Sequence, residues 1–213
     1  MPGMTRVMIV DDHAVVREGL KMILEGQEDI SVVAEAGDDA GTLTRAREQP
    51  MDVILLDVSL PGRSGLEILK QLRYQYPDLA VLMLSIHPED QYAVRFLRAG
   101  ASGYMTKETA PAELVAAIRK VANGGRYVSQ VLAECLVEEL ERPDTAEPHT
   151  RLSDREYQLL VRIGQGLKPA QIAEELHVST KTISTYRSRL LEKMGLSSNA
   201  ELVQYAVRQG LVD

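Results

Sequence analysis

Five short apolar runs, rich in Val and Ile, recur along the first half of the chain. They cover residues 6–10, 30–36, 53–57, 80–85 and 102–106. A segment with the three- and four-residue spacing of an amphipathic helix follows each run. Strands that alternate with helices predict a parallel sheet with helices on both faces, and the strands of such a sheet are apolar on both sides.

Only helical periods remain in the last third of the chain. They cover residues 153–164, 169–176, 179–194 and 198–209. Ser153 with Glu156, and Ser198 with Glu201, match the S-x-x-E box that caps the start of a helix. The pattern therefore predicts four short helices in a small all-α domain.

The segment between these two regions differs from both. A helical pattern covers 129–141, and residues 142–150, RPDTAEPHT, then combine two prolines with polar residues and no apolar period. This composition is typical of a linker. We expect an α/β domain over 1–125, a connecting helix and linker over 126–150, and the all-α domain over 151–213.

The composition of the 213 residues, 45% apolar and 26% charged, is ordinary for a globular protein. No apolar run approaches the roughly 18 residues of a membrane span, and the N-terminal segment does not have the pattern of a secretory signal. We expect a cytoplasmic protein with no membrane partner. The single cysteine, Cys135, cannot form an internal disulfide, and its apolar neighbours predict a buried, inert thiol.

Charge is unevenly distributed along the chain. Residues 1–150 hold 15 Lys and Arg against 24 Asp and Glu, a balance of −9. Residues 151–213 hold 9 against 7, a balance of +2. This asymmetry indicates that only the C-terminal part is suited to meet a polyanion.

Carboxylates follow two of the predicted strands. Asp11 and Asp12 end the first strand, and Asp57 ends the third. In a doubly wound sheet of order 2-1-3-4-5 these strands are neighbours, and ligands bind beyond their carboxyl ends. An isolated charge inside the core would be costly, so we expect Asp57 at the rim, where three acids favour a bound cation or a perturbed proton equilibrium. His13 is interpreted as the start of the next helix.

A hydroxyl and an ammonium are predicted at the same edge, because Ser85 ends the fourth strand and Lys107 follows the fifth. Acids, a hydroxyl and a lysine form a set suited to phosphoryl transfer. The oxygen ligands suit Mg²⁺, and Asp57 is suited to act as a carboxylate nucleophile. Lys107 would pair with the phosphate, and Ser85 would donate a hydrogen bond to it.

These motifs, VDDH, LLDVSLPGRSG, the strand-ending Ser85 and YMTK, resemble those of a response-regulator receiver domain. The resemblance implies a flavodoxin-like, doubly wound, five-stranded parallel fold. It also implies phosphoryl transfer to Asp57 from a phosphohistidine of a sensor histidine kinase, with Mg²⁺ held by Asp11, Asp12 and Asp57. In this family Ser85 would move toward the phosphate while the switch aromatic, here Tyr104, turns inward.

The segment IAEELHVSTKTISTYRSRLLEKMGL has the pattern of a helix, a tight turn and a second helix, an arrangement that docks the second helix in the DNA major groove. His177 occupies the turn, and Ser179 is suited to cap the second helix. Ile183, Leu190 and Met194 fall on one side of that helix and are expected to pack. The opposite side is then available to a ligand.

Residues 178–194 carry a local charge of +3 with several short hydroxyl side chains. We predict contacts to DNA phosphates from Lys181, Arg189 and Lys193, and contacts to base edges from Ser184, Thr185 and Ser188. Arg187 lies close to the apolar side, so its stem could cover the core while its head reaches a backbone phosphate. The alternative is a solvated basic helix of an ordinary bundle.

The segments LSDRE, IAEELHVSTKTIS, LLEKMGL and NAELVQYAVRQG resemble a LuxR-type helix-turn-helix domain, and the whole chain resembles a NarL/FixJ-class regulator. The resemblance implies binding to double-stranded promoter DNA as a homodimer once phosphorylated. It also implies dimerisation through the last helix, where an apolar seam is formed by Leu202, Val203, Ala206 and Val207. The alternative is that this seam packs inside its own domain.

The leading hypothesis is a phosphorylation-controlled transcription regulator. It is not a turnover enzyme, because its only chemistry is single-turnover phosphorylation and dephosphorylation of its own Asp57. One alternative is a phosphatase similar to the haloacid dehalogenases, which generally need an acid two residues after the nucleophile, where this chain has Ser59. The other is a DNA-binding protein that works without phosphorylation.

Overall fold

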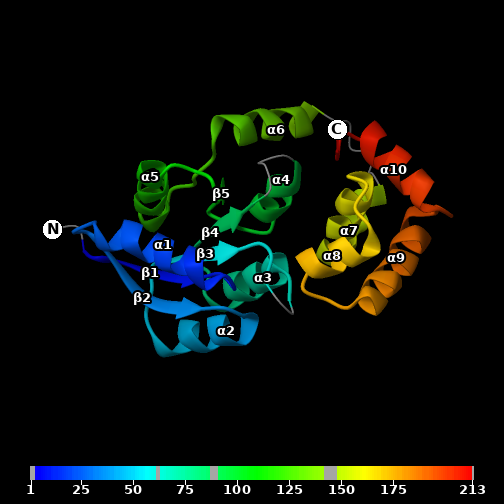
Figure 1. Cartoon of the computed structure of the whole chain (residues 1–213). Coiled ribbons are helices and arrows are strands. Elements are labelled where there is room, and N and C mark those ends of the chain that lie inside the picture. The colour runs from blue at the N-terminus through cyan, green and yellow to red at the C-terminus, as the bar shows by residue number, and fades with distance from the viewer. Residues whose placement is uncertain (1–2, 61–62, 87–90, 142–147, 213) are drawn as a thin grey trace. The chain divides into compact units, whose positions relative to one another are not determined.

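The computed structural model describes residues 3–60, 63–86, 91–141 and 148–212 (Figure 1). The chain divides into two units, residues 1–141 and 142–213. Residues 142–147 of the expected linker lie outside the described residues.

Five parallel strands form the sheet of the N-terminal unit, in the order β2-β1-β3-β4-β5. They are β1 (Thr5–Val10), β2 (Ile30–Ala36), β3 (Val53–Asp57), β4 (Ala80–Ser85) and β5 (Gly103–Thr106). This order confirms the predicted doubly wound fold. Every predicted strand is present, with its ends within one residue of the apolar run that indicated it.

Helices connect the strands and cover both faces of the sheet. They are α1 (Ala14–Glu25), α2 (Asp39–Glu48), α3 (Gly65–Gln75), α4 (Gln91–Arg98) and α5 (Pro111–Ala122). On one face, Ile9 and Leu55 share a buried cluster with Ile118 of α5. Met8 and Ile54, their neighbours along the strands, point to the other face and are also fully buried. Burial on both faces explains why the strands are apolar throughout.

After α5 the chain contacts β5 again, just before α6 (Gln130–Glu141) begins. Tyr127 forms an isolated parallel bridge with Gly103, and its amide donates to the carbonyl of Ser102 at 2.8 Å. The Ser129 hydroxyl then caps α6 by accepting from the amide of Leu132 at 3.1 Å. A helix that begins at the edge of the sheet is thereby anchored by two backbone contacts.

One side of α6 packs against α4, where Leu132 is fully buried. Cys135, one turn further, is only half-buried. The prediction of a buried thiol is therefore wrong, because α6 covers the domain with one side only and Cys135 lies at the margin of that contact.

Four helices and one short 3₁₀ turn build the C-terminal unit. They are η1 (Pro148–Arg151), α7 (Asp154–Gly164), α8 (Pro169–Glu175), α9 (Thr180–Met194) and α10 (Asn199–Arg208). Both predicted capping serines accept a hydrogen bond from the backbone three residues on, Ser153 from Glu156 and Ser198 from Glu201. The predicted all-α domain is confirmed.

The last helix packs against α7 within its own unit. Leu202 and Ala206 are fully buried, Val203 is half-buried, and Val207 is 51% exposed. Two members of the predicted dimer seam therefore belong to the core of the C-terminal unit. Val207, with part of Val203, remains on the surface.

We expect Gly103→Ala to lower the free energy of unfolding by about 1–3 kcal/mol, as overpacking of a core position does. A Cβ at this position would lie 2.8 Å from the Tyr127 carbonyl oxygen and 2.8 Å from Cδ1 of Leu82. The matched control is Gly19→Ala on α1, because a Cβ at that position would have no neighbouring atom within 4 Å. Denaturant unfolding followed by circular dichroism measures both variants, and equal stabilities would contradict the close approach.

Candidate functional site

Two buried carboxylates and one lysine meet at the carboxyl edge of the sheet. Asp11 follows β1 and is 0% exposed, and Asp57 ends β3 and is 2% exposed. The Nζ of Lys107, which follows β5, lies 2.5 Å from Oδ2 of Asp11 and 3.0 Å from Oδ2 of Asp57. The backbone amide of Lys107 donates to the Ser85 carbonyl at 2.7 Å. The strand ends thus bring together the groups that the sequence predicted for this edge.

Burial and the neighbouring charges act together on the proton equilibria of Asp57 and Lys107. It raises the pKa of the Asp57 carboxyl, because the charged form loses its hydration, and the nearby Asp11 adds to this effect against the attraction of Lys107. Burial alone would lower the pKa of Lys107, but Asp57 and Asp11 outweigh it and raise that pKa above its ordinary value. Lys107 is therefore a cation at neutral pH, and one ammonium faces two acids.

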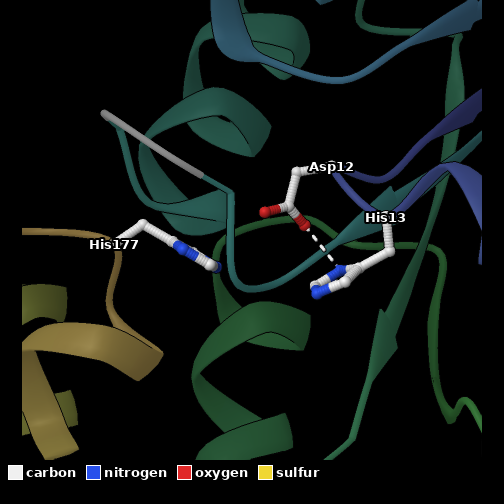
Figure 2. A group of neighbouring side chains, drawn as sticks. All are labelled: Asp12, His13 and His177. Atoms are coloured by element: carbon white, nitrogen blue, oxygen red, sulfur yellow. Dashed lines mark ion pairs between the residues drawn. The ribbon is translucent and has the colours of Figure 1, made fainter.

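Asp12 and His13 extend the acidic cluster toward the surface. Figure 2 shows their ion pair, in which Nδ1 of His13 lies 2.8 Å from Oδ1 of Asp12. The same nitrogen lies 3.2 Å from Oδ1 of Asp11, and the His13 amide donates to that oxygen at 2.9 Å. His177, also drawn in Figure 2, belongs to the C-terminal unit and is described with it.

The donor set at this edge fits a divalent cation. Ligand atoms of Asp11, Asp12, His13 and Asp57 all lie within 4.8 Å of one another. Oδ2 of Asp11 and Oδ2 of Asp57 are buried and receive no hydrogen bond of normal geometry, although the charge of Lys107 is close. Buried carboxylate oxygens of this kind favour a compensating positive charge. The cluster is therefore a site that could hold a metal ion.

Ser85 lies on β4, the strand next to that of Asp57, and Tyr104 lies on β5, one strand further. Ser85 ends β4 and is 1% exposed, at the same edge of the sheet as Asp57. Tyr104 of β5 is fully buried, and its ring centroid lies 5.9 Å from that of Phe96 on α4. Tyr104 therefore packs inside the N-terminal unit, between β5 and α4.

The second helix of the C-terminal motif, α9, has the two sides that the sequence predicted. Ile183, Leu190 and Met194 are buried. His177 lies in the turn before it with φ of 52°, and the Ser179 hydroxyl accepts from the amide of Thr182 at 3.1 Å to cap the helix. The helix-turn-helix geometry therefore follows from local chemistry at the turn and the cap.

The predicted DNA contacts fall on the solvent side of α9, with one exception. The exposed residues are Lys181, Ser184, Thr185, Ser188, Arg189 and Lys193. The exception is Arg187, which is half-buried and donates from Nε to Oδ1 of Asn199 at 2.5 Å.

Several of these side chains already have partners within the C-terminal unit. Each of the three hydroxyls donates to the carbonyl four residues earlier, at 3.1 Å for Ser184, 3.2 Å for Thr185 and 3.1 Å for Ser188. Nζ of Lys193 lies 2.7 Å from Oε2 of Glu156, the glutamate of the α7 capping box. These contacts would compete with contacts to DNA.

Three interactions were missed by the sequence analysis. His13 was interpreted only as a helix start, and no signal placed its ring against the carboxylates. The pairs of Lys193 with Glu156 and of Arg187 with Asn199 each join two different helices of the C-terminal unit. The capping box did single out Glu156, but its partner on α9 depends on how the helices pack.

Comparison with known proteins identifies both units. Residues 7–119 match the response regulator receiver domain, and residues 150–206 match the luxR family of bacterial regulatory proteins. The response regulator GacA of Pseudomonas viridiflava is 41% identical over 211 residues, which cover 99% of each chain. The chain belongs to the two-component response regulators of the NarL/FixJ class, in which a receiver domain precedes a luxR-type domain.

Two solved structures of one such regulator are similar over nearly the whole chain. RcsB of Salmonella enterica serovar Typhimurium, bound to promoter rprA in the presence of phosphomimetic BeF₃⁻, has a TM-score of 0.65 and 25% identity. This likeness covers 95% of the present chain and 98% of RcsB. A structure of two RcsB dimers bound to two parallel DNAs has a TM-score of 0.60 and 25% identity, over 96% and 98% of the two chains.

Family membership does not favour the two alternative hypotheses, the dehalogenase-like phosphatase and the DNA-binding protein that works without phosphorylation. The phosphatase would need a second acid two residues after Asp57, but that position is Ser59. The backbone amide of Ser59 donates to Oδ1 of Asp57 at 3.2 Å.

Among the described residues, no helix combines the length and the apolar character needed to cross a membrane.

The pair of Glu156 and Lys193 makes the stability of the C-terminal unit depend on pH. Burial raises the pKa of the Glu156 carboxyl, but Lys193 and Ser153 outweigh burial and hold that pKa below its ordinary 4.5. The charge therefore stabilises the fold above about pH 4.5, and this stabilisation is lost as the pH falls through the lower pKa of the folded state. Because Lys193 is 46% exposed, solvent screening limits the effect to about 1 kcal/mol.

We expect Glu156→Gln, which can keep the capping hydrogen bond, to be less stable than the wild type at pH 7. The difference should shrink below pH 4.5, as thermal unfolding at several pH values would measure. Glu174→Gln, an exposed site on α8, is the matched control and should show no such trend. A stability difference that stays constant from pH 3 to pH 7 would contradict the pairing.

Proposed function

We propose that this chain is a cytoplasmic transcription regulator that is switched by phosphorylation of Asp57. The observation that carries the proposal is the ammonium of Lys107 between two buried carboxylates, Asp11 and Asp57, in a chain that also has an exposed basic helix in a luxR-type domain. The partners we infer are a sensor histidine kinase and double-stranded promoter DNA.

Asp57 is the nucleophile in this proposal. A carboxylate oxygen of Asp57 attacks the phosphorus of a phosphohistidine on the kinase, so a P–O bond forms while the P–N bond breaks and the imidazole leaves. Lys107, already 3.0 Å from Asp57, would pair with the new phosphoryl group. Ser85, at the same edge, would donate a hydrogen bond from its hydroxyl to a phosphoryl oxygen.

Asp11, Asp12 and Asp57 would hold Mg²⁺, which when bound supplies positive charge between the carboxylates and the incoming phosphoryl oxygens. Asp11 is fully buried, with Lys107 against its Oδ2. We infer no turnover on external substrates. The chemistry of the chain is limited to phosphorylation and dephosphorylation of its own Asp57.

The switch that we propose passes through β4, β5 and α4. A phosphoryl group on Asp57 would draw Ser85 and Lys107 toward it, and the backbones of these two residues are joined by a 2.7 Å hydrogen bond. Any shift of this edge reaches Tyr104, whose ring packs on Phe96 of α4. Two positions of this packed pair would give the receiver its two states.

In the DNA-bound form, Lys181, Arg189 and Lys193 would contact phosphates. The hydroxyls of Ser184, Thr185 and Ser188 would turn from the helix carbonyls toward base edges. Arg187 would keep its bond to Asn199 and reach the DNA backbone from there. We infer a homodimer on promoter DNA after phosphorylation, and the RcsB complexes with promoter DNA and as dimers support this inference.

Phosphorylation is expected to raise the affinity for promoter DNA about five- to 150-fold, the usual range of coupling between two sites. The measurement is the Kd for a promoter fragment selected with the phosphorylated protein, before and after treatment with an acyl phosphate and Mg²⁺. Asp57→Ala should bind with the affinity of the untreated wild type in both samples. Asp78→Ala, an exposed acid outside the site, is the matched control and should respond like the wild type.

Loss of a phosphate contact on α9 should weaken binding to all DNA sequences alike. We expect Lys181→Ala or Arg189→Ala to lower the slope of log K against log salt concentration by about one. Arg208→Ala removes an equal charge from α10 and should leave that slope unchanged. An unchanged slope in the α9 variants would contradict the assignment of this helix to DNA.

A further inference from the structure

A nitrogen donor lies beside the acidic pocket. His13 is the N-cap residue of α1, yet its side chain makes no capping hydrogen bond to that helix. Its ring lies instead against two carboxylates, with Nδ1 2.8 Å from Oδ1 of Asp12 and 3.2 Å from Oδ1 of Asp11. Capping therefore does not explain where this ring points.

These separations match the ligand spacing around one small cation. Ligands about 2.1 Å from an octahedral ion are roughly 3.0 Å from their neighbours and about 4.2 Å from the opposite ligand. The two observed distances, 2.8 and 3.2 Å, bracket the neighbour spacing. With Asp57 added, the four ligand atoms still lie within 4.8 Å of one another. One ion could therefore contact the imidazole and the carboxylates together.

Lys107 and His13 approach different oxygens of Asp11. The Lys107 ammonium lies against Oδ2 of Asp11 and Oδ2 of Asp57. Oδ1 of Asp11 faces His13 instead, where it accepts from the His13 amide at 2.9 Å. The His13 side chain is 59% exposed, so an ion has access from solvent. Oδ2 of Asp11 thus pairs with the Lys107 ammonium, while Oδ1 lies beside His13, where a metal ion would bind.

We propose that His13 is a metal ligand that makes this pocket prefer a first-row transition-metal dication, such as Ni²⁺, over Mg²⁺. The inference rests on the cation site of the proposed function and adds a ligand and a preference to it. Mg²⁺ is bound by oxygen donors and gains little from an imidazole. Imidazole suits Ni²⁺, Cu²⁺ and Zn²⁺, whose affinities for mixed N and O sites also rank above those of harder ions.

A second role for His13 is distinguishable by experiment. The ring could instead only orient Asp12 through a hydrogen bond, without contacting the ion. Its loss would then lower the affinities for both ions by a similar factor of about 10 to 100. A direct ligand affects the two ions differently. The ratio of the two affinities is therefore the decisive quantity.

The test is isothermal titration calorimetry of the full chain with Ni²⁺ and with Mg²⁺. We expect the wild type to bind Ni²⁺ at least about tenfold more tightly than Mg²⁺. His13→Gln should lose about tenfold or more in Ni²⁺ affinity and less than about threefold in Mg²⁺ affinity. His177→Asn is the matched control, because asparagine tolerates the positive φ at that turn, and it should match the wild type for both ions.

A spectroscopic readout checks the ligand itself. With one equivalent of Cu²⁺, pulsed electron paramagnetic resonance should detect imidazole nitrogen in the wild type and in His177→Asn, but not in His13→Gln. Equal losses for Ni²⁺ and Mg²⁺ in His13→Gln, or an imidazole signal that persists in that variant, would overturn the inference while leaving the cation site intact. If the wild type binds neither ion, or if Asp12→Ala binds both unchanged, the cation site of the proposed function fails with it.

Discussion

The ammonium of Lys107 lies 2.5 Å from Asp11 and 3.0 Å from Asp57, and neither carboxylate has more than slight contact with solvent. Two buried negative charges this close would repel each other and lose their hydration, so the fold needs a positive charge between them. The parallel sheet, with β1 beside β3 and β5 two strands from β3, brings these three residues to one edge. The strand order of the receiver unit therefore also fixes the charge balance at this edge of the sheet.

That constraint also explains why the pocket is suited to phosphoryl chemistry. One ammonium does not balance two acids, and the half-buried Asp12 adds a third, so the edge attracts a further cation. Lys107 now pairs with both Asp11 and Asp57. A phosphoryl group on Asp57 would add negative charge beside this ammonium. The hydrogen bond from the Lys107 amide to Ser85 and the packing of Tyr104 on Phe96 provide a physical route from this charge to the outer elements.

Much of this architecture could be predicted from the sequence, because strands, caps and turns depend on local residues. The run 53–57 is apolar because β3 is buried on both faces, and the caps at Ser153 and Ser198 act within one helical turn. The contacts of Lys193 with Glu156 and of Tyr104 with Phe96 depend on how elements approach one another. No local period encodes such an approach, so these contacts required the structure.

The central claim is that the buried carboxylate beside Lys107 accepts a phosphoryl group. The most direct measurement is mass-spectrometric mapping of the full chain after exposure to an acyl phosphate and Mg²⁺. We expect one phosphoryl group per chain, located on Asp57 and absent when this residue is replaced by alanine. Failure to form any phosphorylated species, or a phosphoryl group on another residue, would contradict it.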